Sequence, residues 1–110
     1  MIDKLERILA TARAIPPGRV TSYGRLAMHA GFPRGARLAV AALRGADDET
    51  VPWHRILRAD GRIAFPPDHP HHAEQAQRLR AESVMVRNGR VDLGRFGWRV
   101  DAPDLLLPPD

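Results

Sequence analysis

The segment VPWHRIL, from Val51 to Leu57, places side chains with different chemical capacities next to one another. His54 can act as a general base near neutral pH, and Arg55 can bind a carboxylate or a phosphate. The adjacent Trp53 has an indole, which cannot form a thiolate, and a lone histidine is usually structural. The chain contains no cysteine at all. Thiol chemistry, disulfides and thiolate metal sites are therefore excluded.

Two other groups of residues have types that enzymes use. The segment DHPHH, from Asp68 to His72, holds metal-ligand residue types, but it lies in a proline-containing loop without a typical ligand spacing. Ser22 and Ser83 lack the Gly-x-Ser-x-Gly context of a hydrolase nucleophile. A metal-dependent or hydrolytic enzyme is the least favoured class, and we expect no metal and no other cofactor.

Length and composition indicate one soluble domain. The chain has 110 residues, of which 44% are hydrophobic, enough for a single modest core. No apolar run approaches the ~20 residues that cross a bilayer, so no membrane contact is expected. The first residues include acids and lack a signal-peptide core, which favours the cytoplasm. We expect a domain over residues 1–100 and a flexible Pro/Asp-rich tail over residues 101–110.

Arginine dominates the first half of the chain. No acidic residue lies between Glu6 and Asp47, whereas this interval holds seven arginines: Arg7, Arg13, Arg19, Arg25, Arg34, Arg37 and Arg44. A segment of one sign within a folded domain favours a polyanionic partner such as nucleic acid. The alternatives are an ordinary solvated face and, because the chain has sixteen Arg and one Lys, a bias of genome composition.

Three helices are predicted before residue 45. Apolar residues at helical spacing predict an amphipathic helix from Ile2 to Ala14, which Pro16 and Pro17 would terminate. A second helix is expected to start after a Thr21 or Ser22 cap and to end near residue 30. After a turn at residues 31–33, a third helix is expected over residues 34–44, with Gly45 beyond its end.

The second and third helices match a helix-turn-helix pattern, in which the second helix enters a groove of DNA. Small Gly35 and Ala36 would let the backbone approach DNA closely, while Arg34 and Arg37 reach phosphates or bases. A helical hairpin that only builds a core remains the alternative. The DNA-binding residues predicted from this pattern are Thr21, Ser22, Arg34, Arg37 and Arg44.

Two turns and one further helix are predicted in the second half. The Asp60–Gly61 and Asn88–Gly89 pairs are typical of tight β-hairpins. Between them, residues 71–83 are expected to form a helix after a rigid proline-rich loop.

Several segments together resemble a known family. They are IPPGRVTSYG (residues 15–24), ARLAV (36–40), PWHRI (52–56), RAES (80–83) and GRFGW (94–98). In this order and spacing they are similar to the alkyltransferase-like proteins. That family matches the C-terminal DNA-binding domain of the O6-alkylguanine-DNA alkyltransferases, with another residue, usually tryptophan, at the cysteine of the Pro-Cys-His-Arg signature. The resemblance covers nearly the whole chain, and it implies a mainly α, α+β single domain with a winged-helix-like helix-turn-helix and a short β-hairpin.

The resemblance implies how two residues would meet DNA. Tyr23 would press on the phosphate beside the target nucleotide, and Arg37 would enter the base stack from the minor groove to fill the gap of a flipped base. Flipping costs a few kcal/mol, and less for a poorly paired alkylated guanine. From the residues alone, Tyr23 as an aromatic at the edge of the core and Arg37 as an ordinary phosphate contact remain open.

The resemblance also assigns the signature. His54 and Glu82 match the pair that would activate the cysteine through water; without one, we expect them to form structural hydrogen bonds, and Arg55 a structural ion pair or backbone contacts. Trp53 would line the alkyl pocket, or simply fill it. The implied lesion pocket comprises Pro52, Trp53, His54, Ile56 and Tyr23.

Two features depart from the family. The loop before the signature reads GADD (residues 45–48) and lacks the alkyltransferase asparagine. Some relatives have a basic residue after the hairpin that contacts the extruded base, where this chain reads Phe65-Pro66-Pro67. Arg58 or Arg62 could substitute, or Phe65 could stack on the base.

The resemblance thus implies a monomeric, non-enzymatic protein that binds O6-alkylguanine in double-stranded DNA and holds it without alkyl transfer. It would flag the lesion for nucleotide excision repair, through a damage-recognition protein of the UvrA type, and shield it from alkyltransferases. The alternative is a sequence-specific helix-turn-helix regulator.

Overall fold

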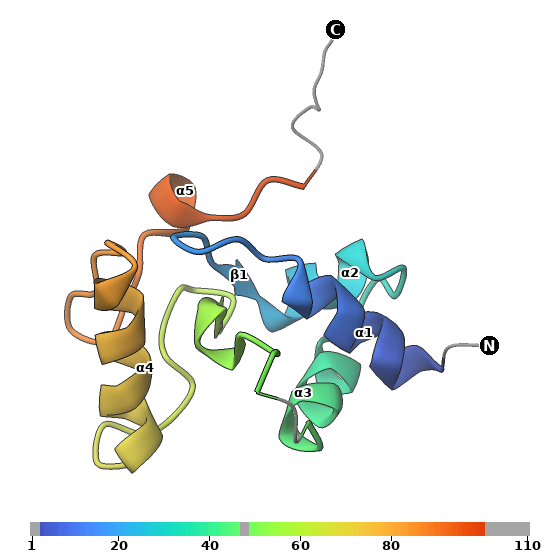
Figure 1. Cartoon of the computed structure of the whole chain (residues 1–110), viewed down its shortest axis with the longest axis horizontal. Coiled ribbons are helices and arrows are strands. Elements are labelled where there is room, and N and C mark those ends of the chain that lie inside the picture. Colours follow the sequence, from blue (N-terminus) through green and yellow to red (C-terminus); the bar gives the residue numbers. More distant parts are fainter. Residues whose placement is uncertain (1–2, 47–48, 101–110) are drawn as a thin grey trace, which may run out of the picture.

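A computed structural model describes residues 3–46 and 49–100 (Figure 1). It is mostly helical with a two-stranded sheet, and the predicted fold class is confirmed. The elements are α1 (Lys4–Arg13), β1 (Thr21–Ser22), α2 (Tyr23–His29), α3 (Ala36–Arg44), the 3-10 turn η1 (Trp53–Arg55), β2 (Ile56–Leu57), α4 (Pro70–Ala81) and α5 (Leu93–Phe96). The tail over residues 101–110, expected to be flexible, lies outside the described residues.

Helix α1 follows from its capping residue and its apolar stripe. The Asp3 carboxylate accepts a hydrogen bond from the Glu6 backbone N–H at 2.8 Å, which satisfies one of the free donors at the start of the helix. Ile8 and Ala12, four residues apart, are buried on the face that meets α2 and α3. The helix ends at Arg13, shortly before Pro16 and Pro17, which were predicted to terminate it.

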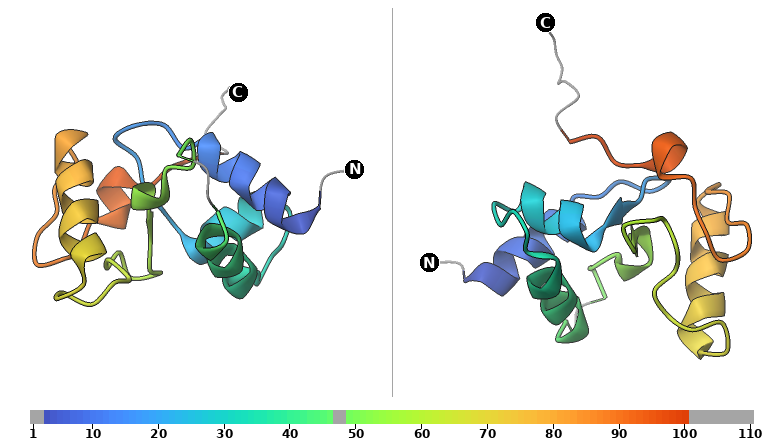
Figure 2. Two further views of the ribbon diagram at one scale, coloured as in Figure 1. Left: turned by 60° about the horizontal axis from the view of Figure 1, so that its bottom comes forward. Right: turned by 180° about the vertical axis from the view of Figure 1, so that it is seen from behind.

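Helices α2 and α3 pack against each other and against α1 (Figures 1 and 2). The connection between them is longer than predicted, because α3 starts at Ala36. Arg34 has a φ of +64° and lies in the turn, so the prediction that it stands on the helix is wrong. A Cβ atom on Gly35 would lie 2.7 Å from the Phe32 carbonyl oxygen and 3.0 Å from Ala27 Cβ. Glycine therefore permits the close approach of the two helices.

The two short strands join the halves of the molecule. β1 and β2 pair in parallel, with Thr21 opposite Ile56 and Ser22 opposite Leu57. Successive side chains of a strand point to opposite faces. Accordingly, Ile56 enters the core beneath α1–α3 and Leu57 enters a second core beside α4.

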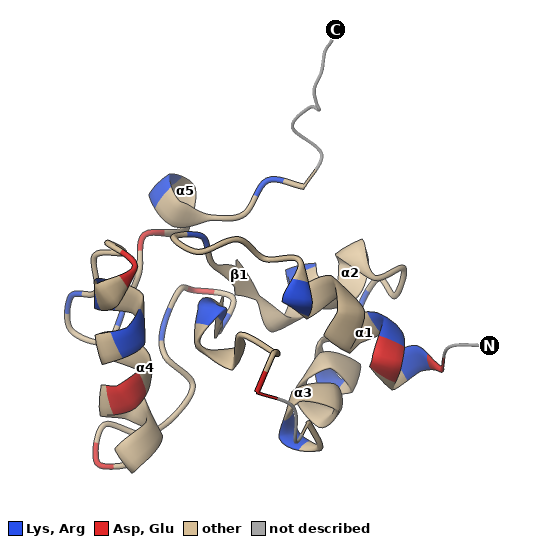
Figure 3. Ribbon diagram, viewed as in Figure 1, with Lys and Arg blue, Asp and Glu red and all other residues tan. Residues whose placement is uncertain are grey.

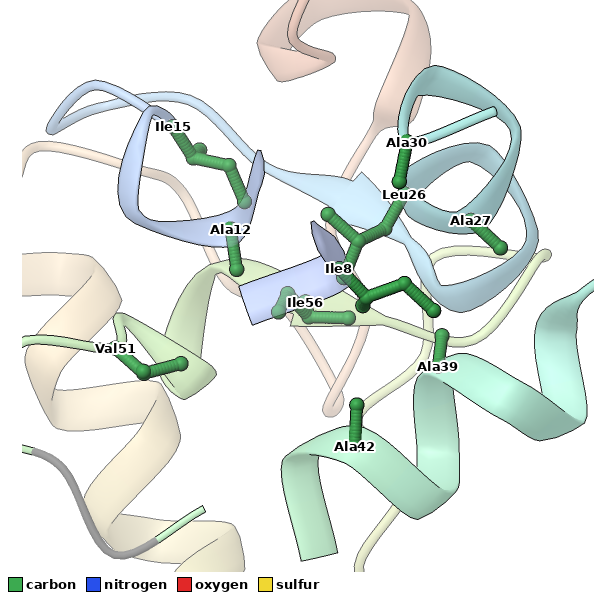
Figure 4. Close-up of a cluster of buried hydrophobic side chains, with 10 residues drawn as sticks. All are labelled: Ile8, Ala12, Ile15, Leu26, Ala27, Ala30, Ala39, Ala42, Val51 and Ile56. Carbon is green, nitrogen blue, oxygen red and sulfur yellow. The ribbon is translucent and has the colours of Figure 1, made fainter. Parts of the chain in front are cut away.

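Figure 4 shows the first core, which comprises Ile8, Ala12, Ile15, Leu26, Ala27, Ala30, Ala39, Ala42, Val51 and Ile56. The second core comprises Val20, Leu57, Ile63, Ala76, Leu79, Val84, Val86 and Val91. Most helix positions in the first core are alanine, which lets the three helices pack closely.

The two predicted turns are present, but their strands pair differently. Asn88 and Gly89 both have positive φ angles, 54° and 71°, as a type I′ turn requires, and Arg87 and Arg90 exchange backbone hydrogen bonds across them. The chain after Gly61 pairs with this segment and not with β2. At Gly61 (φ +88°) an added Cβ would lie 2.3 Å from the Val91 carbonyl oxygen, so the glycine allows the two segments to meet.

Helix α4 begins at Pro70, whose ring favours the first helical position, one residue before the predicted start. It ends at Ala81, and Ser83 has a φ of +66°, which stops the helix earlier than predicted. None of the helices over residues 3–46 and 49–100 is long and apolar enough to span a membrane.

Candidate nucleic-acid interface

The signature residues form a single 3-10 turn directly before β2. The Trp53 N–H donates to the Val51 carbonyl at 2.8 Å, and the Arg55 N–H donates to the Pro52 carbonyl at 3.0 Å. Pro52, which was predicted to line the lesion pocket, is buried and stands at the start of this turn. The turn leaves the Trp53 ring half-exposed and directs the His54 ring into the interior.

Glu82 organises this turn from the end of α4. Its carboxylate lies 2.8 Å from His54 Nε2 and accepts hydrogen bonds from Arg55 Nη2 at 2.6 Å and Nε at 3.0 Å. It also accepts the Gly18 N–H at 3.0 Å, and Arg55 Nη1 donates to the Ile15 carbonyl at 2.8 Å. His54, Arg55 and Glu82 therefore form one network that ties the signature to the loop after α1.

The network sets the charge of its members. Burial raises the pKa of Glu82, but the hydrogen bonds from Arg55, Gly18 and His54 outweigh burial and lower this pKa to about 2. Burial lowers the pKa of His54, against the opposing effect of Glu82. Near neutral pH the carboxylate is ionised and the imidazole is neutral. A neutral His54 then donates from Nε2 to Glu82, and Nδ1 is buried with no hydrogen-bond partner among the described residues.

Gln75 holds the backbone of the same turn. Its side chain is almost fully buried, and Nε2 donates to the carbonyls of His54 and Ile56, both at 3.0 Å. These two carbonyls flank Arg55, so one amide fixes both ends of the segment that carries the signature. The sequence did not single out Gln75.

Aromatic and imidazole rings surround Trp53. Phe65 meets the indole edge-on with a centroid distance of 5.9 Å, and His71 lies 5.4 Å away. His69 lies 4.9 Å from Phe65 and 5.0 Å from His71. The indole thus stands in a packed cluster of rings, which we call the ring cluster: Trp53, Phe65, His69 and His71.

Arg78 supplies a cation to this cluster. Its guanidinium carbon lies 5.3 Å from the centroid of the Trp53 ring, and Arg78 also pairs with Glu74 at 2.6 Å. Sequence reasoning missed Arg78. Its spacing held the signal, because residues 71, 75, 78 and 82 share one face of a helix, and Glu82 was already expected beside His54.

The predicted DNA-contacting arginines follow α3. Arg37, in its first turn, and Arg44, its last residue, are both exposed and stand seven residues apart, which places them on one stripe of the helix. Arg34 is exposed just before the helix. Figure 3 shows basic but no acidic positions on α2 and α3. This part of the surface is therefore suited to a polyanion.

Tyr23 is the first residue of α2 and is half-buried against the first core. Burial raises the pKa of Tyr23, and the positive charge of Arg44 opposes this shift. Among residues 3–46 and 49–100, no hydrogen bond, ion pair or ring contact joins Tyr23 or Arg37 to Trp53. The predicted site thus comprises two groups, one on α2 and α3 and one around η1.

Three predicted site residues have other positions. Thr21 and Ser22 were predicted to contact DNA, but both are buried in β1, and the Ser22 hydroxyl instead accepts the Arg25 N–H at 3.2 Å to cap α2. Ile56 was placed in the lesion pocket, yet it is 1% exposed within the first core. Strand alternation turns Ile56 inward, and its side chain cannot line a site open to DNA.

The residues predicted to substitute for the missing basic residue also lie in different parts of the structure. Phe65 lies against Trp53, whereas Arg62 pairs with Asp60 at 3.6 Å and lines a different part of the surface. Arg58 is exposed, without contact to the indole among the described residues. No three His, Cys, Asp or Glu residues of the described chain are grouped to hold a metal.

Comparison with known proteins identifies the family of this chain. Residues 3–84 match the family model "6-O-methylguanine DNA methyltransferase, DNA binding domain". Over 95 residues the chain is 41% identical to the "DNA base-flipping protein" of Escherichia coli (84% of this chain, 72% of that protein). Over 96 residues it is 31% identical to "Alkyltransferase-like protein 1" of Schizosaccharomyces pombe (86% and 85%).

One relative has a name that indicates an enzyme. The "Bifunctional methyltransferase/endonuclease" of Picrophilus torridus is 32% identical, over 86% of this chain but only 32% of that protein. Among solved structures, the S. pombe Atl1 complex with damaged DNA containing O6-carboxymethylguanine superposes with a TM-score of 0.79 at 27% identity, covering 90% of this chain and 99% of Atl1. The chain belongs to the DNA-binding-domain family of the 6-O-methylguanine DNA methyltransferases and, within it, to the alkyltransferase-like proteins.

Proposed function

We propose that this protein recognises O6-alkylguanine in duplex DNA and holds it without removing the alkyl group. The observation that carries the proposal is the network of His54, Arg55 and Glu82, which positions residue 53 although that residue is tryptophan. An orienting base and carboxylate stand beside a side chain that cannot accept an alkyl group. The arrangement serves binding and not transfer.

The binding mode combines the two groups of residues. Arg37 on the exposed stripe of α3 enters the stack and replaces the extruded nucleotide, while Arg44 and Arg34 neutralise phosphates. Tyr23, at the start of α2, stands beside the phosphate of the target nucleotide. The extruded guanine packs against the ring cluster, whose indole face already carries the Arg78 cation. The relative Atl1, crystallised with O6-carboxymethylguanine DNA, supports this mode by its similarity.

The absence of chemistry is directly testable. Incubation with a duplex containing one O6-methylguanine should produce a complex that excess unlabelled lesion duplex displaces. Mass spectrometry should afterwards recover both the protein and the modified strand unchanged. A gain in protein mass of about 14, the net mass added when a methyl group replaces a hydrogen, would overturn the non-enzymatic part of the proposal.

The protein binds its lesion as a monomer and marks that lesion for repair. It shields the alkyl group from alkyltransferases and presents the site to a nucleotide-excision-repair protein of the UvrA type. A UvrA-type protein should bind the lesion duplex more tightly when this protein is present and should bind plain duplex equally with and without it. If the preformed complex blocks the repair protein, the flagging role is wrong while lesion binding stands.

A further inference from the structure

A second positively charged surface lies away from α3. A concavity of about 830 Å³ is formed by the Asp60 turn, the segment around Asn88 and helix α5. Four arginines line it: Arg62, Arg87, Arg90 and Arg95. All four are exposed. In Figure 1, α5 lies at the top of the molecule and α3 at the bottom. We call this concavity the α5 groove.

The local structure orients these arginines and leaves most of their charge unneutralised. Arg87 and Arg90 flank the type I′ turn and exchange backbone hydrogen bonds at 3.0 and 3.1 Å, so the turn fixes where both side chains start. Arg90 Nε donates to the carbonyl, not the carboxylate, of Asp60. Within the part of the chain that the structure describes, neither Arg87, Arg90 nor Arg95 has a carboxylate within salt-bridge distance.

The acidic residues of the groove are occupied locally. Asp60 pairs with Arg62 at 3.6 Å and accepts the Arg62 backbone N–H at 3.1 Å. Asp92 caps α5 by accepting the N–H groups of Gly94 and Arg95. The groove therefore offers three unpaired guanidinium groups to a ligand.

Apolar surface lies between these charges. Met85 is 48% exposed in the groove, and the half-buried Phe96 lines it with the Arg95 guanidinium 4.9 Å from its ring centroid. Arginine, methionine and aromatic residues are the types enriched where proteins meet other proteins. A DNA backbone would match the arginines, but its deoxyribose carbons offer little apolar surface to cover Met85 and Phe96.

We infer that the α5 groove docks an acidic segment of a partner protein that also carries apolar side chains. Carboxylates of the segment pair with Arg87, Arg90 and Arg95, and its apolar side chains cover Met85 and Phe96. Because the groove shares no lining residue with the ring cluster or with α3, the protein can hold DNA and this partner together. The inference extends beyond the proposed lesion binding and does not depend on it.

The test uses the full chain and a fluorescein-labelled peptide of alternating glutamate and leucine. The double variant Arg87→Gln/Arg90→Gln, whose backbone turn is retained, should bind this peptide about tenfold more weakly than the wild type. It should bind plain and O6-methylguanine duplexes as the wild type does. Arg44→Gln is the matched control, expected to weaken DNA binding and leave the peptide unaffected.

The apolar half of the inference has its own controls. Met85→Ser should weaken binding of the glutamate-leucine peptide. A glutamate-serine peptide should bind the wild type less tightly than the glutamate-leucine peptide does. Equal peptide affinities for the wild type and the double variant would overturn the inference. So would a double variant that loses duplex binding, because the arginines would then serve DNA. Absence of lesion preference in the wild type would defeat the proposed function alone.

Discussion

The Nε2 atom of His54 lies 2.8 Å from Oε2 of Glu82, and this contact is part of a network that stabilises the fold. The same carboxylate holds Arg55, which reaches the carbonyl of Ile15 beyond α1. A pair of residues suited to general-base chemistry thus forms a clamp between η1, α4 and the N-terminal loop.

Replacing Glu82 by glutamine should destabilise the protein by about 2 kcal/mol, because Arg55 would remain largely buried without its counter-charge. Urea unfolding measures the free energy. Glu74→Gln is the matched control on the same helix, because its pair with Arg78 is exposed, and its loss should cost less than about 1 kcal/mol. Equal losses for the two variants would contradict the clamp.

The contribution of Glu82 should also depend on pH. Its folded pKa of about 2 lies below the ordinary value of 4.5, so its stabilising effect is fully present above the ordinary value and declines as pH falls toward the folded value. The difference in unfolding free energy between wild type and Glu82→Gln should shrink as pH falls below about 4.5. A difference that grows with acid would have the wrong sign.

His54 should affect the unfolding free energy in a higher pH range than Glu82 does. Burial lowers its pKa in the folded state, so the unfolded chain takes up a proton first as pH falls below the ordinary value of 6.5. Wild-type unfolding free energy should therefore decrease from about pH 7.5 to about pH 5.5, and His54→Gln should flatten this decrease. An unchanged slope in His54→Gln would contradict this assignment.

Gln75→Leu should leave two buried carbonyls without a donor and cost about 2 kcal/mol of stability. The same change at exposed Gln77 should be nearly neutral. Because the lost bonds hold η1, the variant should also show a shifted tryptophan fluorescence spectrum. An unchanged spectrum with wild-type stability would mean that Gln75 does not fix the turn.

The two arginines of α3 should differ in effect. Arg37→Ala should reduce the preference for O6-methylguanine duplex over plain duplex, because the gap left by the flipped base loses its filler. Arg44→Ala should weaken both duplexes similarly and reduce the dependence of log Kd on log salt by about one phosphate contact. Fluorescence anisotropy titrations at several salt concentrations measure both. Intact discrimination in Arg37→Ala would refute its assigned role.

Local signals predicted part of this structure. The Ser22 cap, the helical spacing around Ile8 and the Asn88–Gly89 turn depend on neighbouring residues, and each appears as expected. The parallel pairing of Thr21 with Ile56 joins segments far apart in sequence, which no turn signal encodes. That pairing is also why Ile56 is buried in the core and not in a pocket.

The residues of the candidate site divide in the same way, into those that sequence motifs identified and those whose roles depend on tertiary packing. Resemblance to a family identified Trp53, His54 and Glu82 because motif positions carry over between relatives. Gln75 and Arg78 were missed because their roles arise only when α4 packs beside η1. Arg34 was misplaced because its left-handed backbone conformation interrupts an otherwise helical pattern.

We propose that the site around Trp53 recognises the alkylated base. The most direct measurement is the ratio of dissociation constants of the wild-type protein for one duplex carrying guanine and for the same duplex carrying O6-methylguanine, at one salt concentration. We predict binding to the lesion duplex at least about tenfold tighter. Equal dissociation constants would contradict lesion recognition and leave a general or sequence-specific DNA-binding protein.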